Sequence, residues 1–299
     1  MSLTSPYSER LPSQKGRDGG IAAGFQETGI RLGVDVCERL TSRLSEKSDL
    51  AKALRLAAKT LRKISCRRTV RRYANEPWMK EILRCQDEIA SCDPSPLYLS
   101  TYRDKETYYW LHVPKWIYED SRGCTFTRCL DIGCAYGTLA LFCKRVCRCD
   151  IHCVDVFDTY LSMSLAKKHG LDFRLCNIET DPLPWNLGFD VVILTEVLEH
   201  LNFNPVPTLA KIGSLLSENG RLYLSTPDAQ EAGRVTKYYS SWTEIPHPTR
   251  GGRLVDEHIY QYSKDELFEV VNRAGLRVER MEYSPGVGVR HFNTVLVKK

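Results

Sequence analysis

Two acids and two glycines have the types and spacing that suit a nucleotide-like ligand. The apolar run that ends at Asp131 is followed by Gly133 and Gly137, and a second apolar run, 151–154, is followed by Asp155. Glycines let a loop turn tightly and bring bare backbone close to a ligand, and a helix that starts after the loop directs free N–H groups into the same space. The pattern therefore predicts a strand, a tight loop and a helix start around a nucleotide-type site.

The positions that a dinucleotide fingerprint would fill with three glycines are Gly133, Ala135 and Thr138, so that motif is not met. The spacing Asp-x-Gly-x-x-x-Gly, with Asp155 as a second acid, resembles the class I S-adenosylmethionine-dependent methyltransferases instead. Their ligand carries a cationic sulfonium, an ammonium group and a ribose diol, all of which suit carboxylates. The resemblance implies that Asp131 lies beside the methionine end, that the two glycines pass under the ligand, and that Asp155 accepts the ribose hydroxyls.

The same resemblance assigns residues at the ends of two further predicted strands. Asn177 and Ile178 follow the strand 171–176, where many family members carry an acid that meets the adenine amino group. Asn177 departs from this pattern, but an amide oxygen can accept the same hydrogen bond. We therefore expect Asn177 and the Ile178 backbone to bind adenine, and Thr195, after the strand 189–194, to complete the cofactor site.

Three ionisable side chains come directly after that strand. At about 100° per residue, Glu196, Glu199 and His200 share one arc of a helix, and apolar residues share the other. Because open α/β sheets bind ligands outside the carboxyl ends of their strands, the polar arc is predicted to face the active-site crevice. Three uses stay open: His200 as general base for an acceptor hydroxyl, the trio as ligands of a divalent cation, or a wet structural face.

The Glu-x-x-Glu-His segment resembles that of ubiquinone-pathway O-methyltransferases and of small-RNA 2′-O-methyltransferases. In the RNA enzymes a downstream histidine completes a metal site, and His258 is suitably placed for that role. The implied ligands of Mg²⁺ or Mn²⁺ are Glu196, Glu199, His200 and His258. A stretch at about 227–256 is expected to form a lid or acceptor wall, and its His247 is a second candidate base. The candidate catalytic residues are thus His200, His247, His258 and Glu196.

The elements that would position these residues alternate between strand and helix. Apolar runs begin at Cys129 and span 151–154, 171–176, 189–194 and 220–227, with helical patterns between them. Two β-rich runs at 276–283 and 291–297 are separated by Ser-Pro-Gly. The pattern predicts an α/β fold with a doubly wound, Rossmann-like methyltransferase sheet, mostly parallel, that a C-terminal antiparallel hairpin closes.

The chain is predicted to have three parts: a mobile tail at 1–28, a helical basic extension at 29–96 and the methyltransferase domain at 97–299. A proline-rich linker at 91–96 marks the last boundary. Eight basic residues and no acidic one lie between Arg55 and Arg72. This stripe is read chiefly as a solvated helix face, with RNA or an anionic membrane as the alternative partner.

The composition supports a soluble globular protein. The chain has 299 residues, of which 42% are apolar, enough for a large core. No apolar run approaches the ~18 to 20 residues of a membrane span, and the first 20 residues are polar, so a cytoplasmic location is expected. The twelve cysteines are expected to be reduced thiols rather than disulfides or a zinc cluster.

These observations favour an enzyme that transfers the methyl group of S-adenosylmethionine to oxygen. The preferred acceptor is a sugar, a glycan-lipid or a phenolic small molecule, on resemblance to bacterial enzymes with the same Glu-His segment. One alternative is a metal-assisted RNA 2′-O-methyltransferase, and another is a noncatalytic protein that binds the cofactor or a partner. The oligomeric state stays open.

Overall fold

The computed structural model describes residues 32–34, 36–37, 39–40, 48–92, 95–232, 237–249, 254–286 and 289–299. The predicted tail at 1–28 lies outside these residues. The chain divides into two compact units, residues 1–65 and 66–299. In the first unit, Gly33 approaches Leu61 of helix α2 (Asp49–Arg72) so closely that an added Cβ would lie 3.2 Å from its Cδ1 atom. The second unit holds the sheet and the predicted site.

Seven strands form one mixed sheet in the described part of the second unit, in the order β3-β2-β1-β4-β5-β7-β6. Strands β1 to β5 run parallel, and β7 is antiparallel to both β5 and β6. This arrangement confirms the predicted sheet and its closing hairpin. The strands are β1 (Arg128–Ile132), β2 (Asp150–Asp155), β3 (Leu171–Leu175), β4 (Phe189–Thr195), β5 (Leu216–Pro227), β6 (Leu276–Ser284) and β7 (His291–Lys298).

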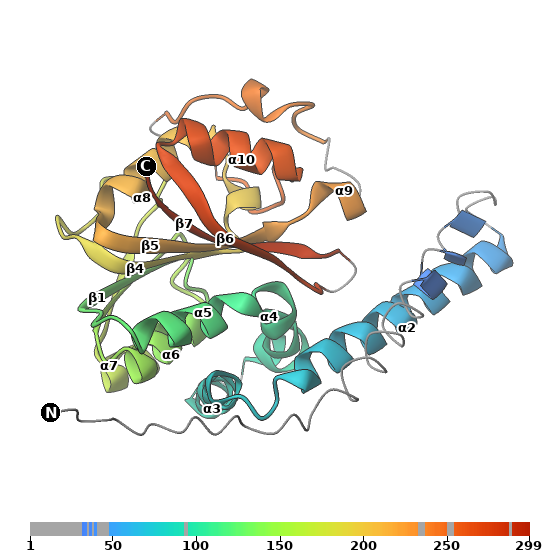
Figure 1. Ribbon diagram of the computed structural model, residues 1–299, viewed down its shortest axis with the longest axis horizontal. Helices are drawn as coiled ribbons and strands as arrows, with labels where there is room; N and C mark the ends of the chain where they lie inside the picture. Colours follow the sequence, from blue (N-terminus) through green and yellow to red (C-terminus); the bar gives the residue numbers. More distant parts are fainter. Residues whose placement is uncertain are drawn as a thin grey trace, which may run out of the picture. The chain divides into compact units, whose positions relative to one another are not determined.

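Helices cover both faces of the sheet, as Figure 1 shows. Strand β4 reads as a continuous apolar run because it is buried on both sides. Val191 and Ile193 pack into the cluster on one face, whereas Val192 and Leu194 pack into the cluster on the other. One face carries α3 (Pro77–Cys92), α5 (His112–Ser121), α6 (Thr138–Val146) and α7 (Met163–His169), and the other carries α8 (Pro205–Leu215) and α10 (Lys264–Arg273).

The helices before the sheet include one, α3, that packs directly against a helix of the methyltransferase domain we predicted. Helix α2 continues to Arg72. Helix α3, which we placed in the N-terminal extension, packs on α6, and Arg145 of α6 pairs with Glu81 of α3 at 2.9 Å. The compact unit accordingly begins at Cys66, whereas the proline-rich break near 96 was our predicted domain boundary.

Substitution of Ile82 tests whether α3 contributes to the hydrophobic core. Its side chain is fully buried, so Ile82→Ala is expected to lower the free energy of unfolding by about 2–5 kcal/mol. The neighbouring Leu83 is 40% exposed and provides the matched control, because Leu83→Ala leaves no buried cavity. Urea denaturation of both variants measures the difference. Equal, small losses would show that α3 contributes little to the core.

The chain reverses its winding direction between β1 and β4, which are neighbours in the sheet. The loops that follow these two strands leave toward opposite faces, and such a switch point opens a crevice at the carboxyl ends of the strands. Short elements lie along this part of the chain: η1 (Tyr98–Tyr102) and α4 (Arg103–Tyr109) before β1, η2 (Leu198–His200) after β4, and α9 (Ala229–Ala232) after β5. The turn η3 (Trp242–Glu244) contacts α10 instead, where Arg273 lies over the Trp242 ring. None of the described helices has the length and apolar content needed to cross a bilayer.

Candidate functional site

The loop after β1 needs its first glycine for close packing. Gly133 has φ +69°, and a Cβ there would lie 2.4 Å from Cγ2 of Val197. The backbone N–H groups of Gly133 and Cys134 donate to the carbonyl of Val154, at 2.8 and 3.3 Å. This loop therefore packs tightly against Val154 at the end of β2 and Val197 just after β4.

Gly137 is the N-cap of α6. It has φ +81°, and a Cβ there would lie 2.7 Å from Cδ1 of Leu161. It does not line either of the two cavities described below. That Gly137 passes under the ligand stays a prediction.

Two adjoining cavities open at the carboxyl ends of β1 and β4. The larger has a volume of about 400 Å³ and the smaller about 160 Å³. The two cavities adjoin, since five residues line both of them: Tyr102, Gly133, Ala135, Glu196 and His200. Of the predicted site residues, the larger cavity gathers Asp131, Gly133, Thr195, Glu196, Glu199, His200 and His258, and the smaller adds Asp155 and Ile178.

The two predicted acids lie on either side of the loop. Asp131 is 2% exposed, and burial, with repulsion from Asp155, raises its pKa to about 7. Asp155 accepts backbone N–H groups from Ala135 at 3.0 Å and Phe157 at 3.1 Å, while burial raises its pKa. Because Asp155 lines the smaller cavity, its carboxylate is available to a ligand there.

Asn177 does not reach this cavity. Its side-chain oxygen accepts the backbone N–H of Glu179 at 2.9 Å, and its own N–H donates to Asp181 at 2.9 Å. The side chain is therefore used in its own turn, as asparagine often is. Ile178, its neighbour, lines the smaller cavity.

The segment after β4 reaches the crevice with a backbone that differs from the helix we predicted. Glu196 has φ +56°, a left-handed conformation that is rare outside glycine, and only Leu198–His200 form a short 3₁₀ turn. Leu198 and Leu201 are buried in the core. The polar residues still converge on the cavity, because the left-handed residue turns the chain before the 3₁₀ turn begins.

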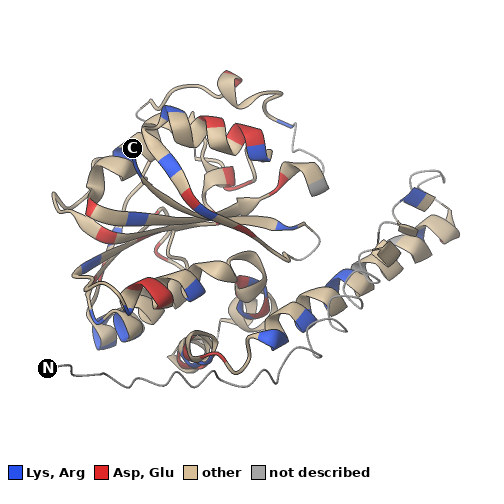
Figure 2. Cartoon of the chain, in the orientation of Figure 1, with Lys and Arg blue, Asp and Glu red and all other residues tan. Residues whose placement is uncertain are grey.

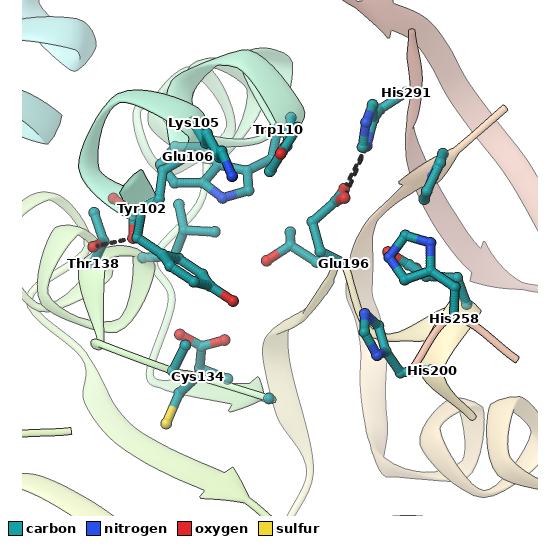
Figure 3. Close-up of a pocket in the computed structure, with 18 of the residues that line it drawn as sticks. Tyr102, Lys105, Glu106, Trp110, Cys134, Thr138, Glu196, His200, His258 and His291 are labelled. Carbon is teal, nitrogen blue, oxygen red and sulfur yellow. Dashed lines mark hydrogen bonds and ion pairs between the residues drawn. The ribbon is translucent and has the colours of Figure 1, made fainter. Parts of the chain in front are cut away.

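Glu196 pairs with a histidine that sequence reasoning missed. His291, at the start of β7, places Nδ1 2.8 Å from one Glu196 oxygen, and Ser225 donates its hydroxyl to Glu196 at 2.7 Å (Figure 3). Burial alone would raise the Glu196 pKa, but these partners hold it below its usual range. Glu196 is thus an ionised carboxylate at the junction of the two cavities.

Glu199, His200 and His258 form a compact group within the part of the chain that the structure describes. One ligand atom of each lies within 4.8 Å of the others (Figure 3). Glu199 is 1% exposed; Thr226 donates to one of its oxygens at 2.9 Å, and the other oxygen has no hydrogen-bond partner among the described residues. Burial and repulsion from Glu196 raise the Glu199 pKa well above its usual range.

The histidines of this group are suited to metal binding. Burial lowers the pKa values of His200 and His258, so both imidazoles are neutral near pH 7 and keep a lone pair. The set of one carboxylate and two imidazoles with an unpartnered buried oxygen fits a divalent cation. Glu196, the fourth predicted ligand, is outside this group because His291 and Ser225 hold it. No cysteine belongs to this group among the described residues.

His247 is not brought to either cavity. It is exposed, and the carbonyl of the preceding residue, Pro246, accepts the backbone N–H of Asn204 at 2.7 Å. Asn204 is the N-cap of α8, so this part of the insertion is fixed there. The role of His247 as a base stays a prediction, without support from either cavity. From the same insertion, Asp256 does reach the smaller cavity, where its Oδ1 lies 3.5 Å from Nδ1 of His200.

A second missed residue is Glu106 of α4. Its two carboxylate oxygens accept hydrogen bonds from Thr138 and Gln86, each at 2.8 Å, and it lines the larger cavity (Figure 3). Burial raises its pKa to about 7. The neighbouring Lys105 lines the same cavity. No local sequence pattern marks Glu106 or His291 as site residues.

Comparisons with known proteins identify the family of the chain. A family model described as a methyltransferase domain matches residues 66–280. A search of curated proteins found no match. The crystal structure of the 1,6-didemethyltoxoflavin-N1-methyltransferase of Burkholderia thailandensis, with bound 1,6-didemethyltoxoflavin and S-adenosylhomocysteine, has a TM-score of 0.50 at 18% identity, and the match covers 73% of this chain and 88% of that chain.

Other solved structures share the fold at lower similarity. An S-adenosylmethionine-dependent methyltransferase of Clostridium acetobutylicum has a TM-score of 0.48 at 14% identity, with 72% of this chain and 100% of that chain covered. The CcbJ methyltransferase of Streptomyces caelestis has a TM-score of 0.46 at 14% identity, with 61% and 94% covered.

Proposed function

Because this chain belongs to the methyltransferase domain family, we propose that it transfers the methyl group of S-adenosylmethionine to a hydroxyl oxygen, assisted by a divalent cation. The observation that carries the proposal is the continuity of the two cavities. One end offers acids suited to the cofactor, and the other offers the group of Glu199, His200 and His258. An acceptor in the larger cavity would thus meet the cofactor and the cation together.

The smaller cavity suits the adenosine part of the cofactor. Asp155 has a carboxylate that can accept both ribose hydroxyls, and Ile178 offers an apolar wall for adenine. The structural neighbour from Burkholderia thailandensis binds S-adenosylhomocysteine on the same fold, which supports this class of ligand. The methionyl part would then extend past Gly133 into the larger cavity.

Glu106 and Lys105 suit the charged end of the methionyl group. We expect the Glu106 carboxylate, with Asp131, to hold the ammonium group, and Lys105 to meet the carboxylate. The ionised form of Glu106 is needed, and its pKa is about 7. Cofactor affinity should therefore rise as the pH rises from about 6 to about 7.5, because the carboxyl loses its proton in this window.

Calorimetric titrations across this pH range measure the effect. Glu106→Gln should weaken S-adenosylmethionine binding and remove much of the rise, with Asp131 accounting for the remainder. The control ligand is 5′-methylthioadenosine, which lacks the ammonium group and should bind both proteins equally at every pH. An equal loss of affinity for both ligands would contradict the assignment.

The residues of the chain supply position and a proton acceptor. Glu199, His200 and His258 would hold the cation, and two nitrogen ligands favour Mn²⁺ over Mg²⁺. A bound cation lowers the pKa of a coordinated hydroxyl. The acceptor oxygen then attacks the methyl carbon, the carbon–sulfur bond breaks, and its electron pair goes to sulfur. Glu196, ionised and present in both cavities, is placed to take the hydroxyl proton.

The preferred acceptor is a sugar, a glycan-lipid or a phenolic small molecule, which must fit beside the methionyl group in the larger cavity. A second candidate is the 2′-hydroxyl of RNA. The observation that favours it is the row of exposed arginines near the end of α2, including Arg67, Arg68 and Arg71 (Figure 2). If these arginines neutralise RNA phosphates, counterions are released on binding, and the affinity for RNA should fall as salt is added.

Transfer of a labelled methyl group tests these acceptors. Metal-stripped protein is incubated with labelled S-adenosylmethionine and either a panel of sugars and phenols or short RNAs, with and without Mn²⁺. Label in a small hydroxyl compound only with Mn²⁺ would support the proposal. Label in RNA but not in its 2′-deoxy counterpart would favour the second candidate. Cofactor binding with no transfer to any acceptor would favour a noncatalytic binder and contradict the proposal.

A further inference from the structure

A buried glutamine contacts one histidine of the cation group. Gln261 lies between His258 and the start of α10, is 6% exposed and lines the larger cavity. Its Nε2 lies 3.2 Å from Nδ1 of His258. Its Oε1 is buried and has no hydrogen-bond partner among the residues that the structure describes. The amide nitrogen of Gln261 therefore contacts the imidazole of His258, while the amide oxygen has no partner among the described residues.

The hydrogen bond between these side chains decides which nitrogen of His258 can bind a cation. With the NH₂ group toward Nδ1, that nitrogen must accept, and the ring proton then sits on Nε2. Neither nitrogen of His258 has a lone pair for a ligand in that state. Rotating the amide by half a turn brings Oε1 to Nδ1, which then carries the proton and frees the lone pair of Nε2.

We propose that Gln261 is a positioning residue that sets the tautomer of His258, and that its amide oxygen must face Nδ1 for the cation to bind. This inference rests on the cation site of the proposed function. Metal-binding histidines commonly donate their second ring N–H to an oxygen that fixes the tautomer. In this site the oxygen comes from an amide that can present a donor or an acceptor.

The backbone around His258 fixes the position of its ring, and the side chain of Gln261 sets its tautomer. The carbonyl of Glu199 accepts the backbone N–H groups of Ile259 at 2.7 Å and Tyr260 at 3.3 Å. These bonds hold the chain after His258 against the turn that carries Glu199. The ring of His258 meets the edge of His200 at a centroid distance of 4.7 Å, so its position is fixed from that side as well. The choice of ring proton then depends on Gln261.

Two substitutions of nearly equal volume separate this role from simple packing. Gln261→Glu always presents an acceptor to Nδ1, whereas Gln261→Leu presents none. We expect Gln261→Glu to bind Mn²⁺ at least as tightly as the wild type and Gln261→Leu to bind it about 10–100-fold more weakly. Calorimetric titration of MnCl₂ into each metal-stripped protein, without cofactor, measures both. In a His258→Ala background, Gln261→Leu should cause no further loss.

Affinity for 5′-methylthioadenosine without metal is the control, since this ligand would occupy the smaller cavity, which Gln261 does not line, and should bind equally to all three proteins. Equal Mn²⁺ affinities of the glutamate and leucine variants would overturn the tautomer role, as would a further loss in the His258→Ala background. A wild type that binds S-adenosylmethionine but no Mn²⁺ would overturn the cation site itself, and this role with it. Failure of the proposed function is thus distinguishable from failure of Gln261 alone.

Discussion

Glu199→Gln is expected to abolish Mn²⁺ binding and to lower the rate of methyl transfer at least about 100-fold. The substitution keeps the shape of the side chain and its contact with Thr226, but it replaces the only carboxylate in the group formed by Glu199, His200 and His258. The Glu199 carboxyl group would lose its proton on binding a cation and become a charged ligand, which an amide cannot do, and two neutral imidazoles alone bind a divalent cation weakly. Affinity for 5′-methylthioadenosine, which would occupy the smaller cavity, should stay near that of the wild type, because Glu199 does not line that cavity.

Glu257 provides the matched control for this prediction. It is an exposed acid that pairs with Lys237 and Tyr238 and lines neither cavity. Glu257→Gln should bind Mn²⁺ and transfer methyl groups as the wild type does. Mn²⁺ titrations and initial rates at saturating cofactor separate the two variants. Full activity of Glu199→Gln without metal would show that transfer does not use a cation at this group.

Asp155→Ala is expected to weaken S-adenosylmethionine binding by about 1.5–3 kcal/mol, or about 10–150-fold, because hydrogen bonds from the ribose hydroxyls to a charged group are lost. Asp155→Asn tests the same charge with less change in shape, since an amide oxygen can still accept from Ala135 or Phe157. Its loss should be smaller but in the same direction.

Asp158 serves as the control for the ribose assignment, because it is exposed and close in sequence but lines neither cavity. Asp158→Ala should leave cofactor affinity unchanged. Calorimetric titration of each variant, with thermal unfolding to show that it is folded, gives the comparison. An Asp155→Ala protein that is folded and binds the cofactor normally would remove Asp155 from the cofactor site.

Local patterns were enough to predict the sheet and the acid-glycine loop. Buried strands such as β4 show as apolar runs, and the tight approach of Gly133 to Val197 leaves no room for a side chain. The position of Asp155 beside the smaller cavity follows from its place as the last residue of β2. In each case the residue and the element that positions it are adjacent in sequence, so the signal is contained in a short window.

Residues that depend on distant partners could not be predicted in this way. His291 reaches Glu196 only because β7 inserts antiparallel beside β5, and Glu106 reaches Thr138 only because α4 folds over the start of α6. Asn177 shows the opposite error. Its place after a strand suggested a ligand contact, but its own turn competes for the side chain.

The backbone after β4 also departs from a rule that sequence reasoning applied. A regular helix would have placed Glu196, Glu199 and His200 on one arc, yet Glu196 has φ +56° and pairs away from the other two. Such left-handed residues cost free energy and are often found at functional sites. The two glutamates therefore have different surroundings. Glu196 pairs with His291 and is ionised, whereas Glu199 lies with His200 and His258.

Binding of S-adenosylmethionine is the central claim, and calorimetric titration of the cofactor into metal-stripped wild-type protein near pH 7.5 tests it most directly. The account predicts saturable binding at one site per chain without added metal, with 5′-methylthioadenosine competing for the same site. Folded protein that binds neither ligand, with or without Mn²⁺, would contradict it.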